Sequence, residues 1–343
     1  MPARPDPEEG RVLGSSAQPL CQDYDLAMLD LDGVVYVGGD AVPGAPGHLA
    51  DARAAGMRLA FITNNASRPP AQVAEHLREL GVAAEVDDVV TSAQAAAQVL
   101  VDRFGAGARV VSLGAVGLRE ALGAAGLVPV GADDDAVAIA TGYGPDVLWS
   151  EIMRAAVRIR DGLPWVASNT DGTFPAAFGV APGHGVQVDM LRRFTGVDPV
   201  VAGKPERPLL DETVRRVGGR RPLMVGDRLD TDIEGAQRAQ LDSLLVLTGV
   251  TGLPELVAAP PELRPTFVAP DLAGLLETHQ APVADGDGFA LGGWHAAVAD
   301  GGLTVAGHGA PATWWRAVAV AAWTHLDASG TPADVSGLST PAR

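Results

Sequence analysis

The sequence predicts an α/β protein with a parallel-sheet core, a second α/β domain inserted into that core, and a small C-terminal α+β extension. Short apolar runs alternate with longer amphipathic segments in the N-terminal third, as in repeated strand–helix units. The runs are almost free of polar residues, which is typical of parallel strands buried on both faces. The same strongly apolar pattern resumes after residue 221, so we expect a discontinuous core.

The predicted elements follow in a regular order. Before the insertion, we expect strands at "YDLAML", "RLAFIT" and "DVVTS", each followed by a helix: the stretch after Pro43, then "PPAQVAEHLREL" and "AQAAAQVLVDRF". The capping-box spacing of Thr91 and Gln94 marks the start of the third helix. Within residues 109–200 we expect strands at "RVVSLG", "AVAIATG" and "PWVASN", and a helix over residues 148–160. Strands resume at "PLMVGD" and "SLLVLTG".

Composition also suggests the domain boundaries. Residues 253–285 are Pro-rich and are expected to form a linker. The stretch "FALGGWHAAVADGGLTVAG", followed by "PATWWRAVAVAAWTHLDA", predicts a hairpin and an amphipathic helix. Its tryptophans are Trp294, Trp314, Trp315 and Trp323. They are expected to bury this module against the core or against a second subunit, as in a homodimer. The expected divisions are a flexible N-terminal tail (1–20), a discontinuous core (21–90 and 200–280), an inserted domain (91–199) and the C-terminal extension (286–343).

Charge and cysteine content restrict the class of protein. The formal net charge is −17, which opposes binding to nucleic-acid phosphates and anionic membranes. Cys21 is the single cysteine, so no internal disulfide can form. The sequence shows neither a signal peptide nor a membrane-spanning run, and we expect a cytoplasmic protein with no nucleic-acid or membrane partner. An anionic substrate would need a local positive field from a metal ion, a lysine or helix N-termini.

The segment "MLDLDGVVY" places Asp30 and Asp32 at the end of an apolar run. Residues two apart in an extended segment point to the same side, so both carboxylates can approach one ligand. Two such charges repel unless a cation lies between them or one carries a proton, and both arrangements occur in catalysis. Gly33 permits a tight turn with its backbone N–H available to an anion. For the pair alone, a polar strand end that meets a loop is an equal alternative.

Two further segments carry groups suited to phosphate. "FITNN" places Thr63, Asn64 and Asn65 after the next predicted strand, where a hydroxyl and successive N–H groups can surround phosphate oxygens. "GKPERP" places Lys204 just before a helix that we expect to begin one or two residues later. An ordinary surface lysine is the alternative at that position.

The segment "LMVGDRLDTDI" ends another apolar strand in an acidic loop. Its carboxylates, Asp227, Asp230 and Asp232, suit Mg²⁺, which prefers hard oxygen ligands. The capping-box spacing of Thr231 to Glu234 predicts a helix start at Thr231. Helix capping is therefore an alternative role for Thr231 and Asp232. All four segments follow strands, and ligands of open parallel sheets bind at the carboxyl ends of strands.

Taken together, these segments resemble the motifs of the haloacid dehalogenase superfamily: "DLDGVVY", "ITNN", "GKP" and "GDRLDTDI". The long insertion between Asn65 and Lys204 and its segment "SNTDGTFPAAFGVAPGHG" are similar to subclass IIA, the NagD and p-nitrophenyl phosphatase-like proteins. The resemblance covers about residues 22–275. It implies a Rossmann-like core in which the inserted domain acts as a cap.

The resemblance also implies an Mg²⁺-dependent phosphatase that acts through an aspartyl phosphate. Asp30 would be the nucleophile and Asp32 the general acid and base. Mg²⁺ would be held by Asp30, Asp227 and the backbone carbonyl of Asp32, while Asp232 would support the ion through water or a hydrogen bond. The expected phosphate-binding residues are Gly33, Thr63, Asn64, Asn65 and Lys204.

The cap is expected to close over the phosphate and contact the leaving group. The candidate contacts are Asn169, Asp171, Phe174 and His184, and for each a turn, core or helix-cap role fits the sequence at least as well. A large cap favours a small phosphorylated metabolite. Glycerol 3-phosphate is the expected substrate by analogy with extended members of the branch. Phosphoglycolate, pyridoxal phosphate, sugar phosphates and nucleotides are the alternatives.

Other classes of protein fit the sequence less well. A dehalogenase would not need Asp32 as an acid. A phosphoacceptor signalling domain would not carry so large a cap, and a non-catalytic phosphate-binding protein would not need every catalytic position to be filled.

Overall fold

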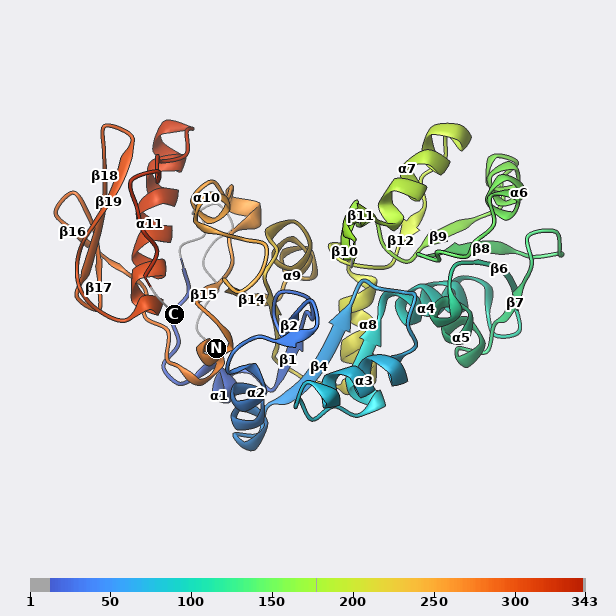
Figure 1. Ribbon diagram of the computed structural model, residues 1–343, viewed down its shortest axis with the longest axis horizontal. Coiled ribbons are helices and arrows are strands. Elements are labelled where there is room, and N and C mark those ends of the chain that lie inside the picture. The colour runs from blue at the N-terminus through green and yellow to red at the C-terminus, as the bar shows by residue number, and fades with distance from the viewer. Residues whose placement is uncertain (1–12, 177, 342–343) are drawn as a thin grey trace. The chain divides into compact units, whose positions relative to one another are not determined.

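Figure 1 shows the computed structural model, which describes residues 13–176 and 178–341. The chain divides into two units. Residues up to Leu59 and from Gly219 onwards make the first, and Ala60–Gly218 make the second. Both contain parallel strands and helices, so the predicted α/β class is confirmed.

The first unit is built on parallel strands in the order β15-β14-β13-β1. These strands are β1 (Leu26–Leu29), β13 (Pro222–Gly226), β14 (Asp242–Val246) and β15 (Phe267–Ala269). Every residue of β1 is buried, as the unbroken apolar sequence predicts, and every residue of β15 is buried as well. The other elements before the extension are α1 (Leu20–Asp23), β2 (Tyr36–Val37), β3 (Asp40–Ala41), α2 (Ala45–Ala54), the π-helical segment η2 (Leu229–Ile233), α9 (Glu234–Ala239), α10 (Leu253–Val257), and the 3₁₀ segments η3 (Pro261–Leu263) and η4 (Leu272–Leu276).

Most of the expected linker is part of the folded unit instead. Residues 253–285 contain α10, η3, β15 and η4, and β15 pairs in parallel with β14. The prediction was wrong because proline and glycine mark turns between short elements as well as linkers. Of the expected flexible N-terminal tail, residues 1–12 lie outside the described residues. For residues 13–20 the prediction was wrong, because they pack against the first unit. Leu13 is buried, and Gly14 N donates a 2.8 Å hydrogen bond to Thr266 O.

The C-terminal extension is an antiparallel sheet followed by one long helix. The sheet has the order β16-β17-β18-β19, and the predicted hairpin is its β18–β19 pair. The elements are β16 (Val283–Asp285), β17 (Gly288–Leu291), β18 (Trp294–Ala299), β19 (Gly302–Gly307) and α11 (Pro311–Ser329). Figure 1 shows α11 between this sheet and β15, and it contacts both.

Helix α11 is buried more completely than an amphipathic helix. Every residue from Trp314 to Trp323 is buried, because the helix packs between the small sheet and the main strands of the first unit. Trp314, Trp315 and Trp323 share one core cluster with Leu245 and Val268, from β14 and β15. Of the two alternatives, burial against the core is therefore the correct one for these three tryptophans.

A charged pair fastens α11 to the rest of the first unit. The guanidinium of Arg264 is 1% exposed and donates hydrogen bonds of 2.8 and 2.6 Å to the carboxylate of Asp327. These bonds hold the pKa of Asp327 below its usual range. The contribution of the pair is therefore complete above the ordinary carboxyl pKa and is lost as the pH falls through the lowered value.

Asp327→Ala is expected to lower the free energy of unfolding by about 1.5–3 kcal/mol, because the buried guanidinium loses its charged partner. Urea denaturation at neutral pH measures the change. Glu262→Ala, which removes an exposed carboxylate nearby, is the matched control and should change little. Equal stabilities for the two variants would contradict the assigned role of the pair.

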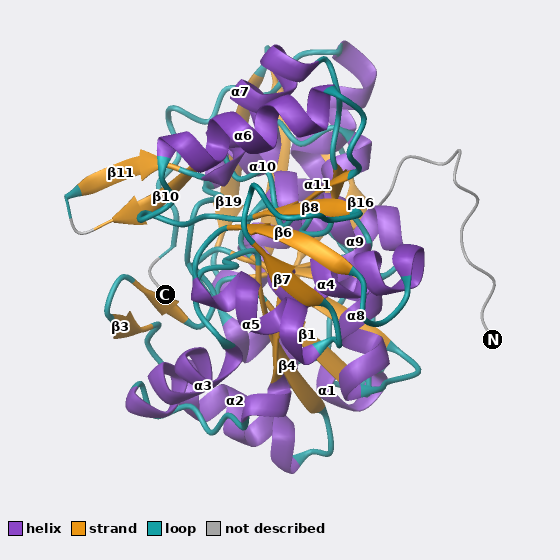
Figure 2. Ribbon diagram, turned by 90° about the vertical axis from the view of Figure 1, so that its right-hand side faces the viewer, coloured by secondary structure: helices purple, strands orange, loops and turns teal. Residues whose placement is uncertain are grey.

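The second unit contains a five-stranded parallel sheet in the order β12-β9-β8-β6-β7 and the parallel pair β4–β5. Helices α6 and α7 cover one face of the five-stranded sheet, and α4 and α5 cover the other (Figures 1 and 2). The strands are β4 (Arg58–Thr63), which starts in the first unit, β5 (Val89–Thr91), β6 (Arg109–Leu113), β7 (Val128–Val130), β8 (Ala138–Thr141), β9 (Trp165–Ala167), the hairpin β10 (Thr173–Ala176) and β11 (Gly179–Pro182), and β12 (Val200–Val201). The helices are α3 (Pro70–Glu79), the 3₁₀ turn η1 (Val86–Asp88), α4 (Ser92–Phe104), α5 (Val116–Ala124), α6 (Trp149–Arg160), α7 (His184–Thr195) and α8 (Pro208–Val217).

Local signals in this unit were reliable. Thr91 and Gln94 form the predicted capping box, with hydrogen bonds from Gln94 N to Thr91 Oγ1 (3.3 Å) and from Thr91 N to Gln94 Oε1 (2.9 Å). The helix expected over residues 148–160 is α6. Among the helices of residues 13–176 and 178–341, none combines the length and apolar character needed to cross a bilayer.

Candidate active site

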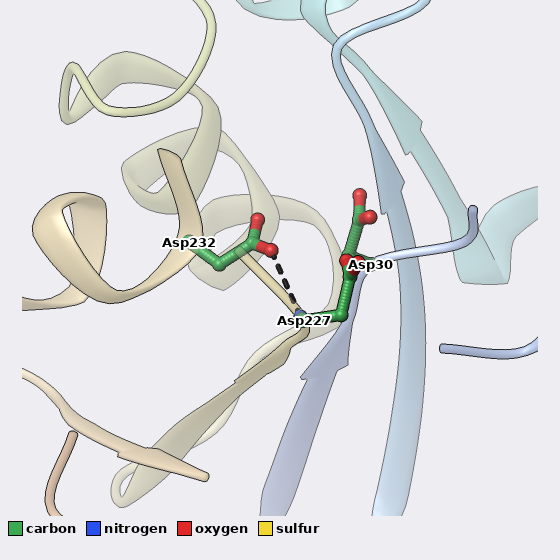
Figure 3. Close-up of side chains that lie close together, drawn as sticks. All are labelled: Asp30, Asp227 and Asp232. Atoms are coloured by element: carbon green, nitrogen blue, oxygen red, sulfur yellow. Dashed lines mark hydrogen bonds between the residues drawn. The ribbon is translucent and has the colours of Figure 1, made fainter. Parts of the chain in front are cut away.

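Three carboxylates gather at the carboxyl ends of β1 and β13, as Figure 3 shows. Asp30 follows β1, Asp227 follows β13, and Asp232 belongs to η2. One oxygen of each lies within 4.8 Å of the others. Asp227 and Asp232 are buried, whereas Asp30 is partly exposed. The parallel pairing of β1 with β13 brings the two strand ends to one edge, so three predicted site residues meet there.

The loop after β14 holds Asp227 in place. Val250 N donates a 2.6 Å hydrogen bond to Asp227 Oδ2. A Cβ atom at Gly33 would lie 2.4 Å from that oxygen, and one at Gly249 would lie 2.0 Å from it, so both positions require glycine. The Thr248 hydroxyl donates to Gly33 O and ties this loop to the turn after Asp30. Sequence reasoning missed this loop, although the glycine that ends the segment "SLLVLTG" was a signal for a turn there.

Asp232 closes the turn that follows β13. Its Oδ2 accepts hydrogen bonds from the backbone N–H groups of Asp227 (3.2 Å) and Arg228 (3.1 Å), and the first of these is dashed in Figure 3. Asp232 therefore orients the backbone that carries Asp227.

The helix start predicted at Thr231 is wrong. The backbone is already helical from Leu229 in η2 and continues directly into α9. Thr231 thus lies inside helical backbone, and the residue that precedes α9 is Ile233, which makes no side-chain cap. The capping-box pattern misled because η2 begins the helix earlier.

The three grouped carboxylates form a site suited to a hard divalent cation. Three negative charges in a small and mostly buried space repel one another unless a cation lies among them. Carboxylate oxygens are the ligands that Mg²⁺ prefers. Asp32 has an exposed side chain and is not one of the three grouped residues.

Gly33 forms the predicted tight turn but does not offer its N–H as expected. Its φ is 87°, in the region that favours glycine, and its N–H donates a 2.8 Å hydrogen bond to Tyr36 O. The expectation that this N–H is available to an anion was therefore wrong, because the turn itself uses the donor.

The predicted phosphate-binding residues of the second unit lie close together. Thr63 is 6% exposed, and its Oγ1 accepts a 3.0 Å hydrogen bond from Asn65 N. Lys204 is buried and is bound through its backbone to the side chain of Asn64. The Oδ1 of Asn65 accepts from the N–H of Ser67 (2.8 Å) and shapes the loop after β4. The helix expected directly after Lys204 begins a few residues later, as α8.

Two of the candidate leaving-group contacts join the same network. Asn169 is 3% exposed, and its Nδ2 donates a 2.6 Å hydrogen bond to Asn64 O. Asp171 Oδ1 accepts a 2.9 Å hydrogen bond from Asn64 Nδ2. Phe174 lies on β10 with its ring against Tyr143, the centroids 4.8 Å apart.

His184 begins α7 in the interior of the second unit. Its Nε2 lies 3.2 Å from Thr141 Oγ1, which also accepts a 2.9 Å hydrogen bond from Trp165 Nε1. Burial lowers the pKa of His184 to about 4, so the ring is neutral near pH 7.

The buried His184 makes stability depend on pH. The unfolded chain, in which a histidine has a pKa of about 6.5, takes up the proton first as the pH falls. The contribution of neutral His184 is therefore complete above that value and is lost between it and about 4. We expect His184→Gln to flatten this part of the dependence, as measured by urea unfolding across the range. Burial also lowers the pKa of His279 to about 4, so the contribution of His279 to the pH dependence of stability remains in both proteins. Identical pH slopes would contradict the prediction.

Comparison with known proteins identifies the family. A model described as haloacid dehalogenase-like hydrolase matches residues 27–128, and a second HAD-hydrolase-like model matches residues 201–275. D-glycerol 3-phosphate phosphatase of Mycobacterium tuberculosis is 44% identical over 294 residues, which cover 84% of this chain and 80% of that protein. Acid sugar phosphatase of Staphylococcus saprophyticus is 33% identical over 254 residues, which cover 73% of this chain and 96% of that protein.

Solved structures agree with the sequence relatives. The glycerol phosphate phosphatase of M. tuberculosis in complex with magnesium matches with a TM-score of 0.82 and 41% identity, over 92% of this chain and 94% of that one. The 4-nitrophenylphosphatase of Thermotoga maritima matches with a TM-score of 0.70 and 30% identity, over 75% of this chain and 98% of that one. The chain therefore belongs to the haloacid dehalogenase-like hydrolase family, among its NagD-like and p-nitrophenyl phosphatase-like phosphatases.

Proposed function

We propose that this phosphatase hydrolyses glycerol 3-phosphate with the help of Mg²⁺ and through an aspartyl phosphate. The group of three carboxylates after β1 and β13, with Asp30 partly exposed, carries the proposal. The 44% identity to a mycobacterial D-glycerol 3-phosphate phosphatase supports the choice of substrate. Phosphoglycolate, pyridoxal phosphate, sugar phosphates and nucleotides would be poorer substrates.

In the proposed reaction Asp30 and Asp32 divide the work. A carboxylate oxygen of Asp30 attacks phosphorus, the bond from phosphorus to the alcohol oxygen breaks, and Asp32 protonates the leaving alkoxide. Water then attacks the aspartyl phosphate, Asp32 takes the proton of that water, and phosphate leaves with Asp30 restored. Bound Mg²⁺ would supply positive charge between the anionic nucleophile and the anionic phosphoryl group.

The residues that would hold Mg²⁺ are Asp30, Asp227 and the backbone carbonyl of Asp32. Asp232 would support the ion indirectly, in keeping with its hydrogen bonds to the backbone of residues 227 and 228. Thr63 and Lys204 would bind the phosphoryl oxygens.

The cap contacts and the domain roles are also part of the proposal. The candidate leaving-group contacts remain Asn169, Asp171, Phe174 and His184. We assign the catalytic core to residues 21–90 and 200–280, the cap to residues 91–199, and the extension to residues 286–343.

The cellular setting and assembly are also part of the proposal. The net charge of −17 supports a protein without nucleic-acid or membrane partners, and the buried thiol of Cys21 suits the reducing cytoplasm. A homodimer would cover Trp149, Met153 and Val157, which are exposed at successive turns of α6. Light scattering of the purified protein would distinguish a dimer from a monomer.

Phosphate release from a panel of esters tests the proposed function. The panel holds glycerol 3-phosphate, phosphoglycolate, pyridoxal phosphate, a sugar phosphate and a nucleoside monophosphate, each with Mg²⁺ or with EDTA. We expect release that EDTA abolishes and added Mg²⁺ restores, with glycerol 3-phosphate giving the largest kcat/KM. A different ranking would overturn the substrate, and release unaffected by EDTA would overturn the metal requirement.

A further inference from the structure

We infer that Asn64 is a positioning residue that fixes the backbone of Lys204 and couples it to the segment 169–171. The inference rests on the proposed function, since it takes Lys204 as the residue that binds the phosphoryl group. It differs from the expectation that Asn64 itself binds phosphate, because the side chain of Asn64 is bonded to Lys204 and Asp171.

A single amide side chain binds both backbone polar groups of Lys204. Asn64 Oδ1 accepts a 2.8 Å hydrogen bond from Lys204 N, and Asn64 Nδ2 donates a 3.0 Å hydrogen bond to Lys204 O. Asn64 is 8% exposed and Lys204 2% exposed, so water does not readily replace either bond. The pair of bonds fixes where the lysine side chain begins.

The same amide reaches the segment that carries two candidate leaving-group contacts. The side-chain Nδ2 of Asn64 donates its second hydrogen to Asp171 Oδ1 (2.9 Å). The backbone carbonyl of Asn64 also accepts a hydrogen bond from Asn169 Nδ2 (2.6 Å). All three polar positions of the primary amide are thereby used. A shift of residues 169–171 would pull on Asn64 and hence on Lys204.

The backbone before Lys204 is shaped for this contact. A Cβ atom at Gly203 would lie 2.5 Å from Asn64 Oδ1 and 2.6 Å from Ser168 O. A larger residue there would push Asn64 and Lys204 apart. The glycine of "GKP" thus serves the approach of Asn64 to the backbone.

Two substitutions separate positioning from bulk packing. Asn64→Ala removes the hydrogen bonds of the amide. Asn64→Asp is nearly isosteric and retains an acceptor for Lys204 N, but it sets a carboxylate oxygen against Lys204 O and Asp171. The double variant N64D/D171N lets the new amide at 171 donate to the carboxylate at 64, and so restores one bond in the reverse direction. Gln98→Ala, which removes a partly exposed amide bonded to Asp102 on α4, is the matched control.

The experiment measures kcat, KM for glycerol 3-phosphate, and the inhibition constant of inorganic phosphate in the full-length protein with Mg²⁺. We expect N64A and N64D to weaken phosphate inhibition and raise KM by about tenfold or more, because each lost buried hydrogen bond costs roughly that factor. N64D/D171N should recover part of the N64D loss, and Gln98→Ala should match wild type. When Lys204 is already replaced by alanine, adding N64A should change KM and the phosphate inhibition constant little further, since Asn64 acts through Lys204.

Thermal unfolding shows whether each variant is folded, and N64D decides the question if N64A does not fold. Unchanged phosphate inhibition in a folded N64A or N64D variant would overturn the inference. So would effects of N64A and Lys204→Ala on KM that are fully additive. If the wild-type protein still releases phosphate, the proposed function stands in either case. A wild-type protein that releases no phosphate from any ester would instead overturn the proposed function, and the inference with it.

Discussion

Replacing Asp30 by asparagine is expected to abolish phosphate release, with a loss on the order of 10⁵-fold or more in kcat. An amide cannot form the acyl phosphate, and removal of a covalent nucleophile leaves only binding and electrostatic contributions. The fold should persist, because Asp30 is partly exposed and asparagine has nearly the same shape. Steady-state kinetics with glycerol 3-phosphate and thermal unfolding of the same preparations measure both parts.

Asp40→Asn is the matched control for this prediction. Asp40 is an exposed carboxylate in β3, so the substitution removes the same charge from the same stretch of chain. Wild-type turnover is expected for the control. Substantial turnover by a folded Asp30→Asn protein would show that another group attacks phosphorus.

Asp32→Asn is expected to lower kcat for glycerol 3-phosphate by roughly 10²–10⁴-fold, the usual contribution of a general acid and base. The size of the effect should depend on the leaving group. Glycerol leaves as a strongly basic alkoxide that needs a proton, whereas p-nitrophenolate leaves readily without one. With p-nitrophenyl phosphate, Asp32→Asn should therefore slow the formation of the aspartyl phosphate much less than its hydrolysis.

This difference predicts a burst in the Asp32→Asn variant. Rapid mixing with p-nitrophenyl phosphate should release about one equivalent of nitrophenolate per active site and then continue slowly, because water attack still lacks its base. The wild-type protein, in which Asp32 would serve both as acid and as base, should show a smaller burst. A slow linear release with no burst in the variant would contradict the second role of Asp32.

The strands were predictable because burial on both faces leaves a direct trace in the sequence. Each apolar run, such as "YDLAML" or "RLAFIT", contains a parallel strand of the structure. The errors arose where one pattern has two structural causes. Proline-rich sequence was expected to be a linker although β15 lies in it, and the capping pattern at Thr231 lies inside a helix. Helix α11 was expected to be amphipathic, but it is buried on both sides. One side packs against the small sheet next to it in sequence, and the other packs against the main strands of the first unit, which are distant in sequence.

The site divides in the same way. Asp30 and Asp227 each follow an apolar strand directly, so their meeting follows from parallel pairing of those strands. The partners of Asn64 could not be predicted, because they lie 107 and 140 positions away in sequence. The hydrogen bond from Val250 N to Asp227 and the space that Gly249 leaves beside this carboxylate likewise depend on a loop that only the fold brings near.

Trapping the aspartyl phosphate tests the central claim most directly. Asp32→Asn protein quenched shortly after mixing with p-nitrophenyl phosphate and Mg²⁺ would be reduced with borohydride, which converts an acyl phosphate of aspartate to homoserine. Peptide mass spectrometry should then find homoserine at position 30, in a yield that follows the nitrophenolate burst and disappears with EDTA. Homoserine at another aspartate, or none at position 30 despite a burst, would contradict the account.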